Sequence, residues 1–416
     1  MPIVTEPMLN PNDPPSPASC VAPLHIALIG TRGVPASYGG FETAVEEIGS
    51  RLADRGHRVT VYCRNSNSSR PDHHLGMHLV HLPAIPSKSL ETLSHTGLSV
   101  IHALLHRKPD AAFLFNAANS PFLPWLHWRD IPTAVHVDGL EWKRGKWGQL
   151  GRRYYRAAES LAVRGADALI ADAQGIADYY DSEFAIPTEL LTYGTTIIDR
   201  VASDRLVSMG LVPKKFHLVV ARFEPENHVD LIVEGYSASA AKYPLIVVGS
   251  APYAASYTDR IASVAAADSR IRLVGGVWDQ KKLDQLYANA LSYLHGHSVG
   301  GTNPSLLRAM GAGTAVIAWD ISFNREVVAS DGEYFSSSST LATLIEDAEA
   351  NLLRQLDNGK ALRERAKRQY NWDTVAVGYE SLAIKLAGGH TTRGLSRGQR
   401  RPRESALTGQ EQVTTP

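Results

Sequence analysis

Residues 297–320 form one continuous pattern, His297-Ser-Val-Gly-Gly-Thr-Asn-Pro-Ser-Leu-Leu-Arg-Ala-Met-Gly-Ala-Gly-Thr-Ala-Val-Ile-Ala-Trp-Asp320. Asn303 can cap the N-terminus of a helix, Pro304 suits its first position, and Gly311 or Gly313 can end it in the left-handed conformation. The apolar run that follows the glycines has the length of a buried strand. The pattern therefore predicts a loop, a short helix and a strand.

The loop before the predicted helix is small and polar. Gly300, Gly301 and Thr302 leave the first backbone N–H groups of the helix unshielded, and the helix dipole adds partial positive charge there. An anion is stabilised at such a place. We expect a diphosphate or a sugar hydroxyl above this helix N-terminus.

Short apolar runs separated by helix-like stretches recur along the whole chain. They lie at residues 25–30, 59–62, 111–115, 133–137 and 168–171, and again at 217–221, 245–249, 271–274, 290–294 and 315–318. This alternation predicts an α/β fold of two Rossmann-like domains, each with a parallel sheet covered by helices on both faces. A ligand is expected in the cleft where the carboxyl ends of the two sheets face each other.

The composition divides the chain into five segments. Residues 1–22 are rich in proline, lack the pattern of a signal peptide and are expected to be a disordered arm. The two domains are expected at 24–195 and 200–370. Residues 371–387 have helical periodicity, and residues 388–416 have none and are expected to form a disordered tail.

The overall charge and the cysteine content exclude several classes of protein. Lys plus Arg and Asp plus Glu both number 42, so the global charge gives no reason to expect nucleic acid as a partner. With only Cys20 and Cys63, no disulfide framework and no cysteine metal cluster are expected, and a reducing cytoplasm is the simplest compartment. No run approaches the length of a membrane-spanning helix, so any membrane contact is expected to be peripheral.

A second glycine loop precedes the first predicted helix. Gly39 and Gly40 allow a close backbone approach, and the helix N–H groups behind them can bind a diphosphate. The spacing differs from the dinucleotide fingerprint Gly-x-Gly-x-x-Gly. From spacing alone, a phosphate site and a tight strand-to-helix turn remain equally good interpretations.

Arg222 is the strongest side-chain candidate for phosphate binding. It follows a predicted buried strand, and an arginine at a strand's carboxyl end can grip phosphate oxygens with two N–H groups. The alternative is a surface ion pair with Glu224 or Glu226.

The segment after the strand at 133–137 is unusually polar. Asp138 and Glu141 are the carboxylates available there to accept a proton or to orient a sugar. For the isolated His136 we favour a role in the core or behind the site. Residues 142–156 then combine six basic side chains with four aromatic ones, which fits either an anionic membrane surface or a solvated helix face.

The 297–320 pattern resembles the donor-binding element of the retaining GT-B glycosyltransferases of family 4. Its His-Ser-Val-Gly-Gly-Thr-Asn-Pro-Ser loop is similar to a rhamnosyltransferase-like branch that builds bacterial cell-surface polysaccharides. The resemblance covers roughly residues 24 to 387. The family's two glutamates are absent, and Arg308 stands where that branch carries the glutamate that holds the ribose hydroxyls.

The resemblance implies roles for the domains and for single residues. The first domain is the acceptor side, the second binds the nucleotide sugar, and the helix at 371–387 returns to the first domain. Asp138 lies beside the reacting centre. The implied donor contacts are Gly39, Gly40, Arg222, Asn227, Gly249, Ser250, Val277, His297, Gly300, Gly301, Thr302, Asn303 and Arg308.

The implied activity is retaining transfer of a sugar, with rhamnose from dTDP-rhamnose as the best match, to a saccharide or lipid-linked saccharide. No metal and no cofactor besides the donor are expected, and the place of action is the cytoplasm, at the inner face of the cell membrane. Two alternatives stay open: a weak or inactive sugar-nucleotide-binding scaffold subunit, and a GT-B nucleotide-sugar epimerase.

Overall fold

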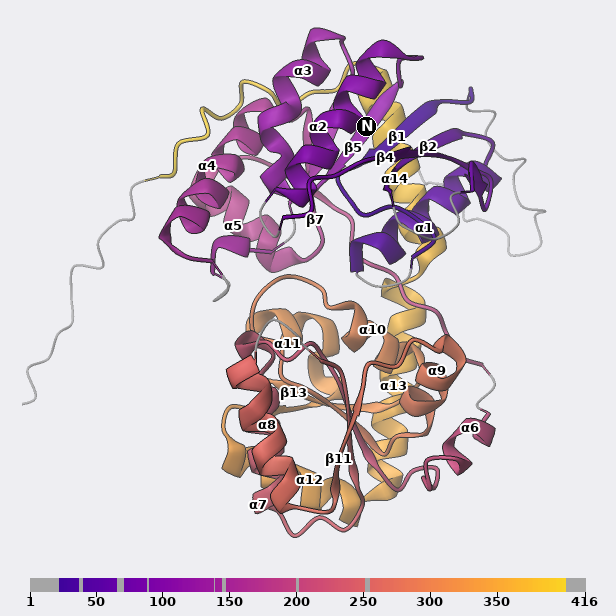
Figure 1. Ribbon diagram of the computed structural model, residues 1–416, viewed down its shortest axis with the longest axis vertical. Coiled ribbons are helices and arrows are strands. Elements are labelled where there is room, and N and C mark those ends of the chain that lie inside the picture. The colour runs from indigo at the N-terminus through magenta and orange to yellow at the C-terminus, as the bar shows by residue number, and fades with distance from the viewer. Residues whose placement is uncertain are drawn as a thin grey trace, which may run out of the picture.

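The computed structural model describes residues 22–36, 40–65, 71–87, 90–137, 139–143, 147–199, 202–250 and 255–401. Two α/β domains follow each other along the long axis, the first at the top of Figure 1 and the second below it. Each domain contains one sheet between layers of helices, so the predicted fold class is confirmed.

The first domain contains a sheet of order β3-β4-β2-β1-β5-β6-β7-β8. All pairs are parallel except the short β3–β4 pair at one edge, which the sequence did not predict. The strands are β1 (His25–Ile29), β2 (Arg58–Arg64), β3 (His73–His74), β4 (Met77–Leu82), β5 (Ala111–Phe115), β6 (Thr133–His136), β7 (Ala168–Ala171) and β8 (Glu189–Leu190).

The helices of this domain cover both faces of the sheet because its strands are apolar on both sides. In β1, Ile26 and Leu28 point into one core, and Ala27 and Ile29 point into another. The helical elements are α1 (Gly40–Asp54), α2 (Glu91–Leu105), η1 (Ala117–Phe122), α3 (Leu123–Trp128), η2 (Glu141–Lys143), α4 (Gln149–Gly165) and α5 (Gln174–Phe184).

The second domain contains a fully parallel sheet of order β11-β10-β9-β12-β13-β14. Its strands are β9 (His217–Val220), β10 (Leu245–Val248), β11 (Ile271–Gly275), β12 (Ser292–His295), β13 (Ala315–Trp319) and β14 (Glu333–Phe335). Its helical elements are α6 (Asp204–Val207), η3 (Pro225–Asn227), α7 (Val229–Ala238), α8 (Ala255–Ala267), α9 (Gln280–Asn289), α10 (Pro304–Gly311), α11 (Ser322–Val328), η4 (Ala329–Asp331), α12 (Ser338–Ala350) and α13 (Leu352–Gln369).

The last helix, α14 (Trp372–Ala387), leaves the second domain and packs on the first, against α1 and β5 (Figure 1). The Asn371 side chain caps its N-terminus by accepting a hydrogen bond from the Asp373 N–H. Glu380 accepts hydrogen bonds from Arg55 and from His57 of the first domain. The chain therefore crosses between the domains twice.

The predicted disordered tail is wrong for residues 388–401. This segment, here called the C-terminal strap, continues from α14 across α4 and α5 of the first domain. The Thr392 N–H donates to the Asp167 carbonyl, and the Arg401 N–H donates to the Glu183 carbonyl. The segment lacks apolar periodicity because it is held by hydrogen bonds and ion pairs. Residues 402–416, like residues 1–21, lie outside the described part of the chain.

None of the helices in the described ranges is long and apolar enough to span a membrane.

Candidate functional site

The glycine loop between β12 and α10 lies against the first domain at the seam between the two sheets. A Cβ atom built on Gly40 would lie 2.9 Å from Pro304 Cγ, and one built on Gly139 would lie 2.4 Å from Gly300 Cα. One built on Gly301 would lie 2.1 Å from Asp172 Oδ1. Glycine is therefore required at three places where the domains meet.

Two helix N-termini converge at this seam. α1 begins at Gly40 and α10 begins at Pro304, and these two residues are in contact. The Asn303 side chain caps α10 by accepting from the Ser305 N–H, as predicted, and Gly313 rather than Gly311 is left-handed, with φ of +71°. The positive ends of both dipoles thus meet in one place, which stabilises an anion.

The glycine loop is held on its own domain by hydrogen bonds to the segment after β9. His297 Nδ1 lies 2.7 Å from Asn227 Oδ1, and the Ser298 N–H donates to the Glu226 carbonyl at 2.9 Å. On the other side, Thr302 Oγ1 donates to the Asp172 carbonyl of the first domain at 2.7 Å. The loop is therefore fixed from both domains.

Arg222 lies at the carboxyl end of β9 and pairs with Glu224, with Nη2 and Oε2 3.2 Å apart. Glu224 is buried, whereas 38% of the Arg222 side chain is exposed. Asn227 Nδ2 donates to the Arg222 carbonyl at 2.8 Å, so this arginine belongs to the same network as His297. The ion pair considered as the alternative is present, and the exposed guanidinium still faces solvent at the strand's end.

Gly249, Ser250 and Val277 lie at the carboxyl ends of β10 and β11. Gly249 has φ of +147°, and a Cβ atom there would lie 1.8 Å from the Ala221 carbonyl oxygen. This glycine is therefore required for the close approach of β9 and β10. Ser250 is exposed, and Val277 is partly buried against the core.

Arg308 points to α9. Its Nη2 lies 2.5 Å from Asp284 Oδ1, and its guanidinium lies 5.9 Å from the centre of the Tyr287 ring. Both members of the pair are about one-third exposed, at 28% and 34%. The positive charge at this position is thus balanced from the neighbouring helix.

Two of the predicted residues, Gly39 and Asp138, lie outside the described residues. Glu141 accepts a hydrogen bond from Trp147 Nε1 at 3.2 Å, at the start of the segment that leads into α4. The structure brings Gly139, next to this segment, into contact with the glycine loop.

His136 and His295 are the last residues of the strands β6 and β12 and are both buried. Burial lowers the pKa of each imidazole to about 3, so both are neutral at physiological pH. His136 stacks on Phe115 and contacts Phe41 edge-on. This is the core role that we favoured for His136.

Asp172 is a site residue that the sequence analysis missed. It follows β7 directly, is 3% exposed and contacts Gly301 and Thr302 of the glycine loop. Burial raises the pKa of its carboxyl to about 7, and the nearby charge of Glu326 adds to the rise. The signal for it was an acid placed immediately after a fully buried strand.

Glu326 of α11 makes a further contact across the seam. Its carboxylate accepts hydrogen bonds from the backbone N–H groups of Gln174 and Gly175 at 2.7 and 3.2 Å, at the N-terminus of α5. The seam is thus closed on both sides of the glycine loop. Among the described residues, no group of three or more His, Cys, Asp or Glu side chains is placed to hold a metal ion.

Comparison with protein families gives one match for each domain. Residues 39–193 match the model described as glycosyl transferase 4-like domain. Residues 210–370 match the model described as glycosyl transferases group 1. Among curated proteins, none matches the chain.

Solved structures of low sequence identity share the fold over most of the chain. Sucrose-phosphate synthase from Thermosynechococcus elongatus is 18% identical with a TM-score of 0.73, covering 88% of this chain and 99% of its own. Anabaena HepE in complex with UDP-glucose is 15% identical with a TM-score of 0.69, covering 87% and 100%. A glycosyltransferase from Rickettsia africae is 13% identical with a TM-score of 0.63, covering 89% and 100%.

Proposed function

Because this chain is a glycosyltransferase of the GT-B type, with a glycosyl transferase 4-like first domain and a group 1 second domain, we propose that it transfers a sugar from a nucleoside diphosphate donor to a saccharide acceptor with retention. The observation that carries this proposal is the convergence of the α1 and α10 N-termini at Gly40 and Pro304. Helix N-termini bind phosphate groups, and a diphosphate supplies one for each of the two helix ends.

Negative charge builds up on the departing diphosphate during the reaction, and the site has to stabilise this charge. The bond between the anomeric carbon and the β-phosphate oxygen breaks, and its electron pair stays on that oxygen. Arg222 and the two helix N-termini stabilise this charge, which is usually the largest catalytic contribution of such a site. The acceptor oxygen bonds the anomeric carbon on the same face, and its proton passes to the leaving phosphate, as the family resemblance implies.

Asp138 and Glu141 are the acceptor-side carboxylates in this proposal. They follow β6, whose last residue lies behind the site, and Glu141 is already oriented by Trp147. Their role is to orient the acceptor hydroxyl while its proton passes to the leaving phosphate, or to accept that proton in place of the phosphate. Asn227, His297 and the loop 300–303 position the donor, mainly through backbone groups.

We propose dTDP-rhamnose as the donor and a lipid-linked saccharide at the inner face of the cell membrane as the acceptor. The rhamnose assignment is supported by the loop at residues 297–305. UDP and UDP-glucose, which HepE binds in its solved structures, are the alternative donor class. A second candidate function, a binding subunit without turnover, is favoured by the pairing of Arg308 with Asp284 at the position expected to hold the ribose.

A panel of dTDP-, UDP- and GDP-sugars tests the proposal in two steps. A bound donor at about 100 times its dissociation constant stabilises the protein by roughly 2.7 kcal/mol, so one class of donor should raise the Tm by several degrees. The same donor should then be hydrolysed slowly without an acceptor. Binding without any turnover would support the binding subunit, and the absence of both would reject a nucleotide-sugar site.

A further inference from the structure

One face of the first domain exposes an unusual number of large apolar side chains. Along α2, Leu98, Ile101 and Leu105 recur at helical spacing and are 38%, 41% and 75% exposed. On the neighbouring α3, Trp125 and Trp128 are 51% and 80% exposed. We call these five residues the α2–α3 face.

The two helices that carry this face are packed together. α2 contacts α3 and η1, and a Cβ atom built on Gly97 of α2 would lie 3.2 Å from the Phe122 ring that precedes α3. In Figure 1, α3 lies at the top of the first domain, and α2 lies below it in the same domain. Pro124, Trp125 and Trp128 also line a shallow hollow open to solvent.

The charge at the edge of this face is basic. Arg107 and Lys108 follow α2, Arg129 follows α3, and all three are exposed and form no ion pair with another residue in the described ranges. The acids nearby are Asp130, which is exposed beside Arg129, Glu91, which pairs with Arg64, and Asp110, which accepts a hydrogen bond from the His25 N–H.

We propose that the α2–α3 face binds peripherally to an anionic lipid bilayer, with α2 lying in the plane of the interface. Tryptophan prefers the headgroup region, aliphatic side chains enter the acyl boundary, and arginine and lysine attract anionic headgroups. This inference rests on the proposed function, because a lipid-linked acceptor must be taken from a membrane.

The position of α2 connects this face to the seam. α2 follows β4 and therefore starts at the carboxyl edge of the sheet, the edge at which Gly139 and Asp172 contact the second domain, and it ends at the opposite edge. Leu90, at its start, is 49% exposed and continues the apolar stripe. A bilayer on the α2–α3 face would therefore extend along the first domain toward the seam.

The basic aromatic segment at residues 142–156 is less suited to this role. Trp142, Trp147, Tyr154 and Tyr155 are all partly buried, and the Tyr154 hydroxyl donates to the Ala118 carbonyl. A second copy of the chain is also a poorer occupant of the α2–α3 face. A symmetric dimer through this face would bring two sets of these basic residues to one interface, whereas an anionic bilayer supplies the opposite charge.

Sedimentation of the full-length protein with lipid vesicles tests the proposal. We expect binding to vesicles of phosphatidylcholine with about a third phosphatidylglycerol, weaker binding to pure phosphatidylcholine, and release by salt. Leu105→Ser should weaken binding about tenfold and Trp125→Ala/Trp128→Ala further. Leu353→Ser on α13 is the matched control, because Leu353 is 78% exposed on the second domain.

The outcomes separate this inference from the proposed function. Unchanged vesicle binding by Leu105→Ser and by the double tryptophan variant would overturn the membrane face. A dimer in light scattering that the double variant converts to a monomer, with no vesicle binding by the wild type, would assign the face to a second copy instead. Donor hydrolysis in the absence of vesicles should be equal in all these proteins. If the wild type does not hydrolyse any donor, the proposed glycosyltransferase activity is rejected, whereas the membrane-binding face is not.

Discussion

Arg222 is the side chain on which donor turnover should depend most. Its replacement by alanine removes a preorganised cation from the departing diphosphate, so we expect kcat/KM for donor hydrolysis to fall about 10²–10³-fold. The Tm should change little because the Arg222–Glu224 pair is partly solvated. Arg354→Ala is the matched control, since Arg354 is 42% exposed and pairs with Glu333 and Asp347 away from the site. Full activity of Arg222→Ala would contradict this role and would mean that Arg222 forms only a surface ion pair with Glu224.

Asp172 should make the stability of the folded chain depend on pH. Its carboxyl has a pKa of about 7 in the folded protein and about 4 when unfolded, so the folded state holds one more proton between these values. The stabilising effect is therefore complete below about pH 4 and is lost as the pH rises through 7.

The variant Asp172→Asn isolates this contribution. Between pH 5 and 7.5 the free energy of unfolding of the wild type should fall by roughly 1–3 kcal/mol more than that of the variant. Urea denaturation at four pH values measures the difference. The nearby titratable groups Glu326 and Tyr379 are unchanged in the variant and cancel in the comparison. Parallel pH curves would show that Asp172 is hydrated in the folded state.

Arg308 and Asp284 should behave as a pair. Arg308→Glu places two carboxylates side by side and should lower the free energy of unfolding by about 1 kcal/mol, and Asp284→Arg/Arg308→Glu should recover most of it. Chemical denaturation of the two single variants and the double variant closes the cycle. Additive effects would mean that the two side chains do not interact in solution.

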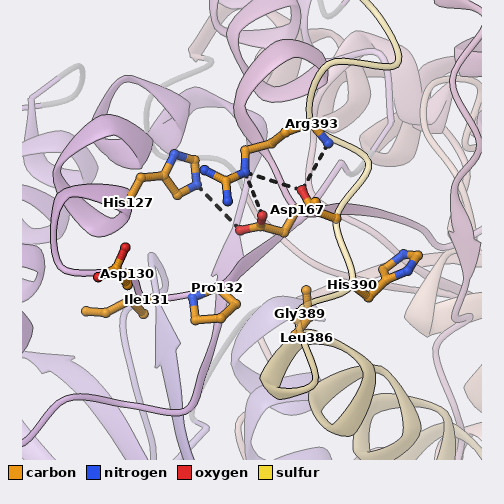
Figure 2. Close-up of a pocket in the computed structure, with 10 residues that line it drawn as sticks. His127, Asp130, Ile131, Pro132, Asp167, Leu386, Gly389, His390 and Arg393 are labelled. Carbon is orange, nitrogen blue, oxygen red and sulfur yellow. Dashed lines mark hydrogen bonds and ion pairs between the residues drawn. The ribbon is translucent and has the colours of Figure 1, made fainter.

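At the level of elements, the C-terminal strap supplies the counter-charges for two buried acids of the first domain. Asp167 pairs with Arg393 at 2.7 Å, and Figure 2 shows this contact beside His127. Burial acts to raise the pKa of Asp167, but the hydrogen bonds from His127 and Thr133 outweigh it and keep the pKa below its usual range. Glu159, which is also buried, pairs with Arg400 of the strap and accepts hydrogen bonds from the Tyr179 and Tyr180 hydroxyls. The strap therefore holds α4 and α5 against the domain.

Removal of one strap arginine should be costly. Arg400→Ala leaves the buried Glu159 without its cation and should lower the free energy of unfolding by about 2–3 kcal/mol. Arg397→Ala, in an exposed strap residue with no ion pair among the described residues, should have an effect near zero. Thermal or urea unfolding measures both, and equal effects would mean that the strap is detached in solution.

The elements themselves were largely predictable, and the strap was not. Asn303, Pro304 and Gly313 determine α10 through local capping and backbone preferences, so the sequence alone predicts it. The strap depends on the ion pairs of Arg393 and Arg400 with acids more than 200 residues away in the sequence. A periodic pattern of residues does not indicate such distant pairs. The short β3 and β8 strands are too brief to leave an alternating pattern.

At the scale of the whole molecule, the two-sheet architecture followed from the alternation of strands and helices. The contacts that close the seam could not be predicted from this alternation. Gly139–Gly300 and Asp172–Gly301 join residues of different domains, and a local pattern says nothing about such pairs. Asp172 was missed for the same reason, since its contacts with Gly301 and Thr302 cross from one domain to the other. The apolar face on α2 and α3 was missed because its leucines and tryptophans are indistinguishable from core residues in sequence.

The central claim is that the seam binds a diphosphate between two helix N-termini with the help of Arg222. Titration calorimetry of a nucleoside diphosphate and its monophosphate against the wild type and Arg222→Ala tests it most directly. The claim predicts that the wild type binds the diphosphate at least about tenfold more tightly, and that most of this margin is lost in Arg222→Ala. Equal affinity for the two nucleotides in the wild type, or an unchanged margin in Arg222→Ala, would contradict it.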